Sequence, residues 1–537
     1  MRPQSALTAL ATGAIATLCL LGATNGPDSD LKPAPVFPQV FLSDVIVSNT
    51  DPDLKNQDKV LNSEPGIAIN PANPQQIVIS SFSGAWTQTA PGQFRNAPIW
   101  FSKNGGSLWT KEFTIPAPPG VSPGFLNESP CDETFDYGRN GVLYGTFLLD
   151  GSGAEGADCS TTSTSETDEE TAGRQVYTGA TTNPSAASAW RWLVVDGKAK
   201  PTNQFSPDQP WIVVNRGPIG PGQGQDQDED QDEDIARENV YVAYQASPTM
   251  QVAVAAAKVP PDFTMDNSSG ISSNFGGNPG LRIAANRSTG AIYSLHQQAA
   301  PIQCPSSASA IDYTVNRSTD GGVTWSLNGN SNGISAARAC SNQNSTIYLF
   351  GELVPGNIDG GVNALKGGVD ALAVDSASGD VYVVFGDFDA SAGRDRIAIV
   401  RLTADGKGGL RVGSTRFVSG PEHQSALPAV AVNSKGAVAV LYDTADELNS
   451  EFTPIFSIHL ALSRDRGQTF QDKVLETFLF PGASSGSTGP RPLGDYQQLK
   501  ALGDTFYGVF TGDGKPFGRP FPHIDPIFFK TSTKSDQ

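Results

Sequence analysis

Histidine, closely spaced cysteines and long apolar runs are scarce in this chain of 537 residues, and each shortage excludes a class of protein. The four histidines show no paired spacing and no CxxC motif occurs, so we predict neither a metal site nor a cofactor. No stretch after residue 23 reaches the roughly 18 apolar residues of a membrane span. Helical periodicity is nearly absent, which predicts an all-β fold with only short helical turns in loops.

Positive charge is also in short supply. Lys and Arg number 36 against 55 Asp and Glu, giving a net charge of -19 and a pI of about 4.6. This balance argues against nucleic acid and membrane surfaces as partners, because their phosphates attract basic patches. Part of the charge lies in QDQDEDQDED, within an insert at about residues 217–237. We expect a solvated, disordered loop there, with a loose calcium site as the alternative.

The N-terminus has the pattern of a secretion signal. An apolar segment from Leu7 to Ala23 follows the single basic Arg2, which predicts a signal peptide over residues 1–23 and a linker over 24–35. A membrane anchor is the competing interpretation. Cleavage would leave four cysteines, an even number that suits a secreted or periplasmic protein. Their spacing favours two disulfides that each staple a loop within one repeat, Cys131–Cys159 and Cys304–Cys340.

Three copies of one short pattern are present: SKNGGSLW from Ser102, STDGGVTW from Ser318 and SRDRGQTF from Ser463. Each fits S-x-[DN]-x-G-x-x-[WF] and follows a short apolar run, which places it on a hairpin turn. We call them the eight-residue turns. The copies start 216 and 145 residues apart, close to three and two units of about 72. The spacing therefore predicts a repeat protein.

A second pattern recurs seven times. A short apolar strand ends in Asn or Asp, a turn that often holds Gly follows, and a strand rich in Val, Ile, Tyr and Phe comes next. With a third strand, the turn and a fourth strand, each repeat has the four antiparallel strands of a propeller blade. The copies are GIAINPANPQQIVISSF, ETFDYGRNGVLYGTF, WIVVNRGP with NVYVAYQ, RIAANRSTGAIYSLH, ALAVDSASGDVYVVF, AVAVNSKGAVAVLY and YQQLKALGDTFYGVF.

We therefore predict a single seven-bladed β-propeller over residues 36–537. Its 502 residues divide into seven units of about 72, whereas six blades, the alternative, do not fit the spacing of the turns. The last repeat stops at its third strand, DPIFFKTS, and the strand QVFLSDVIVSN from Gln39 has no repeat of its own. We expect this N-terminal strand to complete the last blade, because closure leaves no long exposed sheet edge.

The eight-residue turns resemble Asp boxes, the signature of BNR-repeat β-propellers of the sialidase-like superfamily. The segments TTNPSAASAW at Thr181 and TADGKGG at Thr403 look like degraded copies. In that family the box joins the third and fourth strands of a blade, on the rim away from the active site. The resemblance thus implies a structural role for the acceptor and aromatic positions, which are Asn104, Trp109, Asp320, Trp325, Asp465 and Phe470.

A sialidase of this family would carry an F/Y-R-I-P motif near the first blade, an arginine triad, an Asp acid/base and a Tyr–Glu nucleophile. The first blade has no such motif, and arginine is scarce at the repeat starts, with Arg282 and Arg491 the obvious cases. The chain therefore does not read as a true sialidase. No G-x-S-x-G elbow or phosphate loop suggests serine hydrolase or nucleotide chemistry either.

Polar residues at the strand starts are the best site candidates, because loops from all blades of a propeller converge near its axis. As catalytic candidates we select Asp132, Glu133, Asp370 and Tyr496. Opposed carboxylates could supply acid and base for glycoside hydrolysis, and Tyr496 could act as an activated hydroxyl. The predicted substrate-binding residues are Glu64, Trp211, Arg282, Arg491 and Asp495. The competing role for all of them is to cap strand ends.

Two functions are compatible with this sequence. One is a secreted sialidase-like propeller that recognises or processes glycans at the mouth of the central channel, as a glycoside hydrolase if it is an enzyme. The other is a non-catalytic extracellular scaffold that binds protein partners through the same face. We expect a monomer in either case. Paired carboxylates across the channel would favour hydrolysis, and an apolar plug would exclude it.

Overall fold

The computed structural model describes residues 36–58, 62–81, 98–114, 130–149, 175–194, 208–217, 238–246, 249–259, 271–272, 281–304, 308–342, 370–446, 455–479, 493–494 and 496–534. The chain divides into Met1–Phe37 and Pro38–Gln537, and all the described strands belong to the second part. The predicted signal peptide and linker lie outside the described residues. So do nearly all of the acidic insert and the predicted Cys131–Cys159 bridge.

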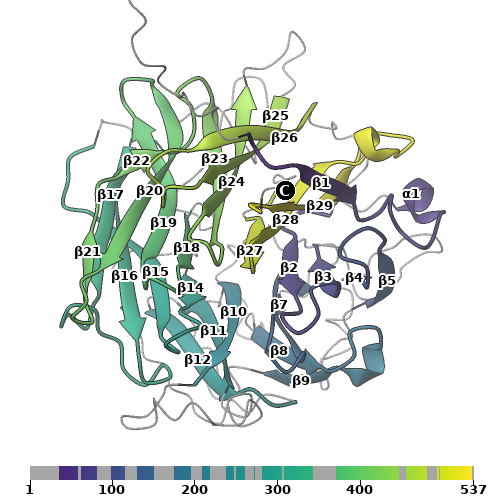
Figure 1. Ribbon diagram of the computed structural model, residues 1–537, viewed down its shortest axis with the longest axis horizontal. Coiled ribbons are helices and arrows are strands. Elements are labelled where there is room, and N and C mark those ends of the chain that lie inside the picture. Colours follow the sequence, from purple (N-terminus) through teal and green to yellow (C-terminus); the bar gives the residue numbers. More distant parts are fainter. Residues whose placement is uncertain are drawn as a thin grey trace, which may run out of the picture. The chain divides into compact units, whose positions relative to one another are not determined.

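Seven antiparallel sheets form a seven-bladed β-propeller (Figure 1), as the repeat spacing predicts. Six sheets have four strands, and that of blade 5 has five because two short strands share its outer edge. Blade 1 consists of β2 (Gly66–Ile69), β3 (Ile77–Ser80), β4 (Pro98–Ser102) and β5 (Thr110–Thr114). Blade 2 consists of β6 (Pro130–Tyr137), β7 (Leu143–Leu149), β8 (Gln175–Thr181) and β9 (Arg191–Val194). Blade 3 consists of β10 (Asp208–Arg216), β11 (Glu238–Ala246), β12 (Thr249–Ala256) and β13 (Ile271–Ser272).

The remaining blades follow in chain order. Blade 4 consists of β14 (Arg282–Ala285), β15 (Ile292–Ala299), β16 (Ala308–Ser318) and β17 (Ile334–Asn342). Blade 5 consists of β18 (Asp370–Val374), β19 (Val381–Asp389), β20 (Arg394–Ala404), β21 (Leu410–Val412) and β22 (Arg416–Phe417). Blade 6 consists of β23 (Gln424–Val432), β24 (Val438–Asp446), β25 (Ile455–Ser463) and β26 (Gln471–Leu479). Blade 7 consists of β27 (Gln498–Leu502), β28 (Thr505–Asp513), β29 (Ile524–Ser532) and the N-terminal β1 (Val40–Asp44).

Helix is confined to single turns in the described residues: α1 (Leu54–Gln57), η2 (Ala187–Ala189) and η4 (Lys515–Phe517). None of the helices in this part of the chain has the length and apolar character needed to cross a bilayer. The central strands are instead buried on both faces. In β19, for example, all five residues from Val381 to Phe385 are 0% exposed. Sheets covered on both faces read as continuous apolar runs, which explains why the repeats show little alternation.

The first strand of each blade forms the inner wall. Each of these strands contacts the first strand of the next blade, and β27 of blade 7 contacts β2 of blade 1. An innermost strand has one edge without a ladder partner, so side chains of the neighbouring blade supply acceptors for its N–H groups. Ile212 N donates to Thr134 Oγ1 at 3.1 Å and Val214 N to Asp136 Oδ2 at 2.8 Å. These bonds tie blade 3 to blade 2.

The three eight-residue turns join the third and fourth strands of blades 1, 4 and 6. In the blade 6 copy, Asp465 Oδ1 accepts the Thr469 N–H at 2.9 Å and Asp465 Oδ2 accepts the Thr469 hydroxyl at 2.6 Å. Ser463 Oγ donates to Asp465 Oδ1 at 2.7 Å and accepts from Gly467 N, also at 2.7 Å. The blade 4 turn repeats this network around Asp320, and Asn104 provides the acceptor in blade 1. The two segments that resemble degraded copies also join third and fourth strands, in blades 2 and 5.

Each eight-residue turn packs against the preceding blade. The backbone of Gly322, at a φ of +90°, lies so close to blade 3 that an added Cβ would be 2.6 Å from Val254 Cγ2. Trp325, three residues later, packs in the same hydrophobic cluster as Val254. In blade 1, the Trp109 ring meets Phe528 of blade 7 edge to face with centroids 5.3 Å apart. The glycine and the aromatic residue of the motif therefore serve contact between blades.

The N-terminal segment closes the ring. Strand β1 pairs antiparallel with β29 over five residues, from Val40 opposite Thr531 to Asp44 opposite Ile527. The chain then reaches blade 1, where Trp109 N donates to Ser48 O at 2.8 Å. Val45 and Ile46, between these contacts, are 0% exposed. The predicted closure of the last blade by this strand is confirmed.

One disulfide lies within the described residues. Cys304, after β15, pairs with Cys340 on β17, so the bridge links two segments of blade 4. This is the second of the two predicted pairings, and it staples a loop within one repeat as expected. The two cysteines are 36 residues apart in sequence. A bridge across this loop stabilises the fold because it restricts the conformations of the unfolded chain.

Removing the closing strand should destabilise the protein sharply. Burial of Val45 and Ile46 alone contributes about 1.5–3 kcal/mol each. We expect a variant lacking residues 1–47 to melt about 10 °C or more below a control lacking only residues 1–35. Differential scanning calorimetry of both proteins makes the comparison. Equal melting temperatures would contradict the closure.

The Asp465 turn should show a pH-dependent contribution to stability. Hydrogen bonds from Thr469 and Ser463 outweigh the opposing effect of partial burial and lower the pKa of Asp465 to about 2. Since its unfolded pKa is near 3.8, the carboxylate stabilises the fold above that value, and the contribution is lost as the pH falls towards 2. Asp465→Asn, which copies the natural Asn104, should remove this dependence, and Asp465→Ala should cost about 1 kcal/mol at neutral pH. Urea unfolding at pH 2 to 7 tests both, and a parallel pH dependence in Asp465→Asn would refute the assignment.

Candidate functional site

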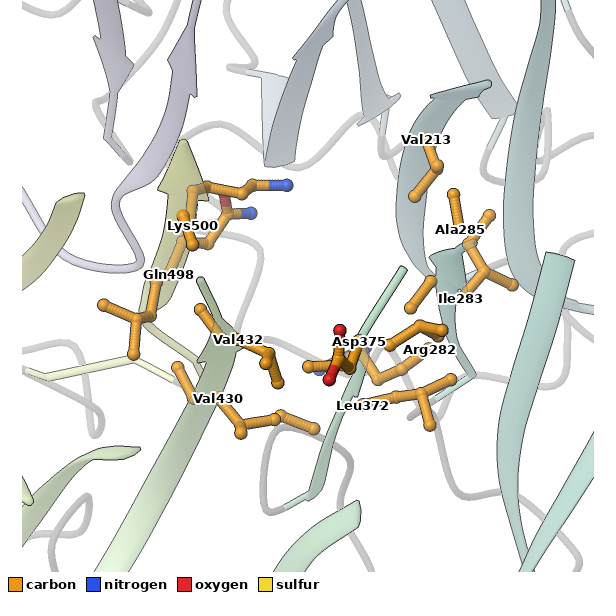
Figure 2. A pocket seen from close by; sticks show the side chains of 18 of the residues that line it. Val213, Arg282, Ile283, Ala285, Leu372, Asp375, Val430, Val432, Gln498 and Lys500 are labelled. Carbon is orange, nitrogen blue, oxygen red and sulfur yellow. The ribbon is translucent and has the colours of Figure 1, made fainter. Parts of the chain in front are cut away.

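A cavity of about 450 Å³ is bordered by the first strands of blades 2 to 7. Aliphatic and polar side chains both line it, with Val213, Ile283, Leu372 and Val430 among the aliphatic residues (Figure 2). The first strands of all the blades run in the same direction along the cavity. We call the end of the cavity where these strands begin the strand-start end, and the end where they finish the strand-end end. Most of the charged lining residues lie towards the two ends, and Lys500 of β27 lies between them. Apolar walls with a few polar groups are typical of ligand pockets.

Trp211, Arg282 and Tyr496 form the centre of the strand-start end. The Trp211 and Tyr496 rings meet edge to face with centroids 5.7 Å apart. The Arg282 guanidinium carbon lies 4.4 Å from the Trp211 ring centroid and 5.9 Å from that of Tyr496. Its Nη2 donates to Gln209 Oε1 at 2.9 Å. Arg282 therefore occupies one face of Trp211, which we predicted as a substrate-binding residue.

Asp370 lines the cavity beside this group and is 1% exposed. Its Oδ2 accepts a hydrogen bond from Gln297 Nε2 at 3.1 Å. Burial raises the pKa of Asp370 to about 6, although the positive charge of Arg282 and the bond from Gln297 oppose the shift. A carboxyl group with this pKa exchanges its proton near neutral pH, as a general acid or base must.

Three further carboxyl groups lie behind Tyr496. Burial, followed by the charges of Asp132, Glu64 and Glu133, holds the pKa of the Tyr496 hydroxyl well above its usual range. Burial likewise raises the pKa of Glu133, with the Asp132 charge adding to the effect. Tyr496 is therefore a neutral hydroxyl at physiological pH. This electrostatic setting suits a hydrogen-bond donor and opposes the phenolate of an activated hydroxyl.

Strained backbone positions several of these residues. Glu64, Asp132, Gln209 and Leu427 have φ values of 49°, 54°, 44° and 50°. They occupy the same position in blades 1, 2, 3 and 6, and in the last three the ladder shifts register there. Strands β6 and β10 accordingly begin before the predicted starts at Glu133 and Trp211. Such left-handed residues and bulges redirect side chains and concentrate at functional sites.

Several buried polar atoms in this cluster have no hydrogen-bond partner in the described residues. They are both carboxyl oxygens of Glu133, the Tyr496 hydroxyl and Asp370 Oδ1. Glu133 is 0% and Tyr496 3% exposed. Unsatisfied buried groups are rare in folded proteins because each costs about 1–3 kcal/mol. Two of these residues, Asp370 and Tyr496, lie beside the Arg282 guanidinium and line the cavity, which indicates a place prepared for polar ligand atoms.

Seven of the nine predicted site residues belong to this cluster. Trp211, Arg282, Asp370 and Tyr496 line the cavity. Glu64, Asp132 and Glu133 act on Tyr496 electrostatically from behind it. Arg491 and Asp495 lie outside the described residues. Gln209 and Gln297, which hold Arg282 and Asp370, were not predicted, since a lone glutamine in a strand-start segment carries no recognisable signal.

No group of three or more His, Cys, Asp or Glu side chains within the described ranges gathers as a metal ion would require. The site consists instead of one cation, several carboxyl groups and two aromatic rings. A seven-bladed β-propeller with a buried polar cluster at the strand-start end of its central cavity is the class of protein that fold and site define.

Comparison with known proteins gives only distant matches. No protein-family model and no curated protein matches the chain. A protein of unknown function from Dyadobacter fermentans is similar in structure, with 12% identity, a TM-score of 0.41 and coverage of 93% of this chain and 100% of the other. The NanB sialidase from Streptococcus pneumoniae matches with 10% identity, a TM-score of 0.39 and coverage of 78% and 69%. The GH93 α-L-arabinofuranosidase of Fusarium graminearum matches with 9% identity, a TM-score of 0.32 and coverage of 74% and 92%. Nothing about the activity of this chain follows from these similarities.

Asp370 should make the protein less stable as the pH rises. Its pKa is about 6 in the folded protein and near 3.8 in the unfolded chain, so the folded state binds more protons between these values. Stability is therefore lost from about pH 4 to pH 6. Asp370→Asn stays neutral, and its stability relative to wild type should rise by about 2 kcal/mol over this interval.

Urea unfolding at pH 4, 5, 6 and 7 measures this difference. Asp405→Asn is a matched control, because turn hydrogen bonds lower the pKa of that exposed carboxyl group. Its stability relative to wild type should not rise with pH. A difference between Asp370→Asn and wild type that stays constant from pH 4 to 7 would contradict the raised pKa.

Proposed function

We propose that this protein recognises or processes a glycan at the strand-start end of its central cavity. The observation that carries the proposal is the convergence of unpartnered polar atoms of Asp370 and Tyr496 beside Arg282, with the buried Glu133 acting on Tyr496. Sugars present many hydroxyl groups that donate and accept hydrogen bonds, and such groups satisfy buried donors and acceptors. The aromatic rings of Trp211 and Tyr496 supply the apolar contact surface that a sugar ring also needs.

The residues divide into two groups by position. Arg282, Asp370 and Tyr496 line the cavity and would contact the ligand directly. Asp370 would transfer the proton if a glycosidic bond is cleaved, because it is protonated below about pH 6 and ionised above. Tyr496 would donate a hydrogen bond. Glu64, Asp132 and Glu133 would position Tyr496 and keep its hydroxyl neutral. Arg491 and Asp495 remain proposed binding residues.

The eight-residue turns support membership of the Asp-box propellers. Their hydroxyl–carboxylate networks and their place between third and fourth strands agree with that motif. We therefore propose that the chain is a sialidase-like propeller that does not cleave sialic acid. The N-terminal signal pattern and the Cys304–Cys340 bridge support export to an oxidising compartment.

Binding without catalysis is the second candidate, and burial of the carboxyl groups favours it. Glu133 is 0% and Asp370 1% exposed, so a scissile bond would have to enter deeply to reach them. A non-catalytic protein could use the same residues to hold a glycan, or the surrounding face to hold an extracellular protein.

A screen of the mature protein on a glycan array and on chromogenic glycosides separates these functions. We expect at least one glycan ligand, and Tyr496→Phe should weaken its binding about 5- to 10-fold by removing one hydrogen bond. If hydrolysis occurs, Asp370→Asn should reduce kcat/KM by about 100-fold or more, and the pH profile should break near pH 6.

Tyr241→Phe is a matched control, because Tyr241 is a buried tyrosine of blade 3 that does not line the cavity. It should leave binding and turnover unchanged. Binding without turnover would select the non-catalytic function. Absence of any glycan ligand would refute the proposal, and release of sialic acid would refute the exclusion of sialidase activity.

A further inference from the structure

Lys500 departs from the repeat pattern inside the cavity. It lies third in β27, opposite Tyr507 in the hairpin ladder. The equivalent residues of the other six hairpins are all apolar, namely Ile67, Phe135, Ile212, Ile283, Leu372 and Val430. A propeller needs an aliphatic or aromatic side chain here to pack against its neighbours. The lysine is therefore not explained by the fold.

The ammonium group of Lys500 is poorly compensated. Figure 2 shows the side chain extending from β27 into the cavity, with Val213 and Ala285 across the opening. No acceptor in the described residues lies within hydrogen-bonding distance of its Nζ, and no carboxylate there forms an ion pair with it. Burial lowers its pKa, which is the mark of a charge removed from water without a close partner. Such a charge is costly until an anion reaches it.

Two charged residues act on Lys500 across the cavity, Asp136 and Arg287. The Asp136 carboxylate already accepts the Val214 N–H at 2.8 Å. Arg287 Nη2 reaches the same carboxylate only at 3.4 and 3.5 Å, a long contact, and the arginine side chain remains 50% exposed. Asp136 is thus engaged by blade 3, and the guanidinium keeps donors that it does not use in the described structure.

We propose that Lys500 and Arg287 form a binding site for the carboxylate group of a small organic ligand. Lys500 and Arg287 lie in the same cavity as the Asp136 carboxylate, while the Asp375 carboxylate there is held by Ala377 N at 2.9 Å and Ser378 Oγ at 2.7 Å. A carboxylate ligand adds one negative charge beside these groups, whereas a doubly charged phosphate adds two, so the balance favours the carboxylate. The cavity of about 450 Å³ admits a molecule of several heavy atoms, and the aliphatic side chains of its wall can contact the ligand's apolar part. Arg287 follows the end of β14 and Lys500 lies in the middle of β27, and neither belongs to the Tyr496 cluster. The site goes beyond the proposed function and does not require that a glycan be cleaved.

Isothermal titration calorimetry at fixed ionic strength tests the site with four probes: glucuronate, acetate, glucose and inorganic phosphate. We expect glucuronate to bind, and Lys500→Met to weaken binding about ten-fold or more. Binding of acetate as well would show that the carboxylate alone suffices, whereas glucuronate alone would assign an acidic sugar. Phosphate binding more tightly than both carboxylates would overturn the assignment. So would an absence of carboxylate binding.

The variants are chosen to separate binding from folding. Lys500→Met restores an apolar side chain at this position, so the ligand-free variant should melt at or above the wild-type temperature. Lys407→Met, on an exposed turn of blade 5, is the matched control and should bind as wild type does. Equal binding by the Lys500 and Lys407 variants would overturn the proposal. If Tyr496→Phe weakens glucose binding and Lys500→Met does not, the glycan site and the carboxylate site are distinct.

Discussion

The pairing of β1 with β29 is the contact on which the rest of the molecule depends. A propeller made from one continuous chain has a seam where its last blade meets its first, and an open seam would expose two sheet edges. Here five residues of the N-terminal segment form the outer strand of blade 7, and the next residues join blade 1. At the inner wall, Ile67 N donates to Gln498 Oε1 at 2.9 Å across 431 residues of sequence. The N-terminal strand thus closes the ring at its outer edge, and the Ile67–Gln498 hydrogen bond closes it at the inner wall.

Closure also creates the candidate site. Tyr496 belongs to the last blade, whereas Glu64 and Asp132 belong to the first two, and only the seam brings them together. The fit is close at Gly494, where an added Cβ would lie 1.9 Å from Glu64 Cγ. A chain that failed to close would lose the electrostatic environment of Tyr496 along with its stability. Stability and the arrangement of the candidate site therefore depend on the same contact.

The cavity places isolated charges among aliphatic and polar side chains. At the strand-start end, Arg282 is offset by Gln209, Trp211 and the nearby Asp370, so its charge is well compensated. Lys500, in the middle of β27, forms no ion pair in the described part of the chain, and the charges of Asp136 and Arg287 act on it in opposite directions. The two regions of the cavity differ in their polar groups. The Tyr496 cluster has a hydroxyl group and carboxyl oxygens without partners among the described residues, whereas the other region has the cations Lys500 and Arg287. A ligand with hydroxyl groups suits the first, and a carboxylate suits the second.

Much of the scaffold could be predicted because the repeats are local. A hairpin with Asn, Gly and β-branched residues, or a turn with Ser, Asp and an aromatic residue, is specified within about 15 residues. Seven copies then implied seven blades, and the strand left over implied closure. The convergence of strand-start residues followed from the same geometry, and Arg282, Asp370 and Tyr496 do lie near one another. Lys500 also had a visible signal as the one charged residue among seven equivalent positions, but only alignment of the repeats reveals it.

Sequence by itself determined the number of blades, the turns at their rims and the closing strand, since these depend on short-range patterns and on counting. Only the tertiary structure decided which groups are left without partners. The hydrogen bonds of Gln209 and Gln297, the left-handed backbone at Asp132 and the neutral state of Tyr496 arise from burial among distant blades. Burial depends on the whole ring, and so the chemistry of the cavity cannot be read from any single repeat.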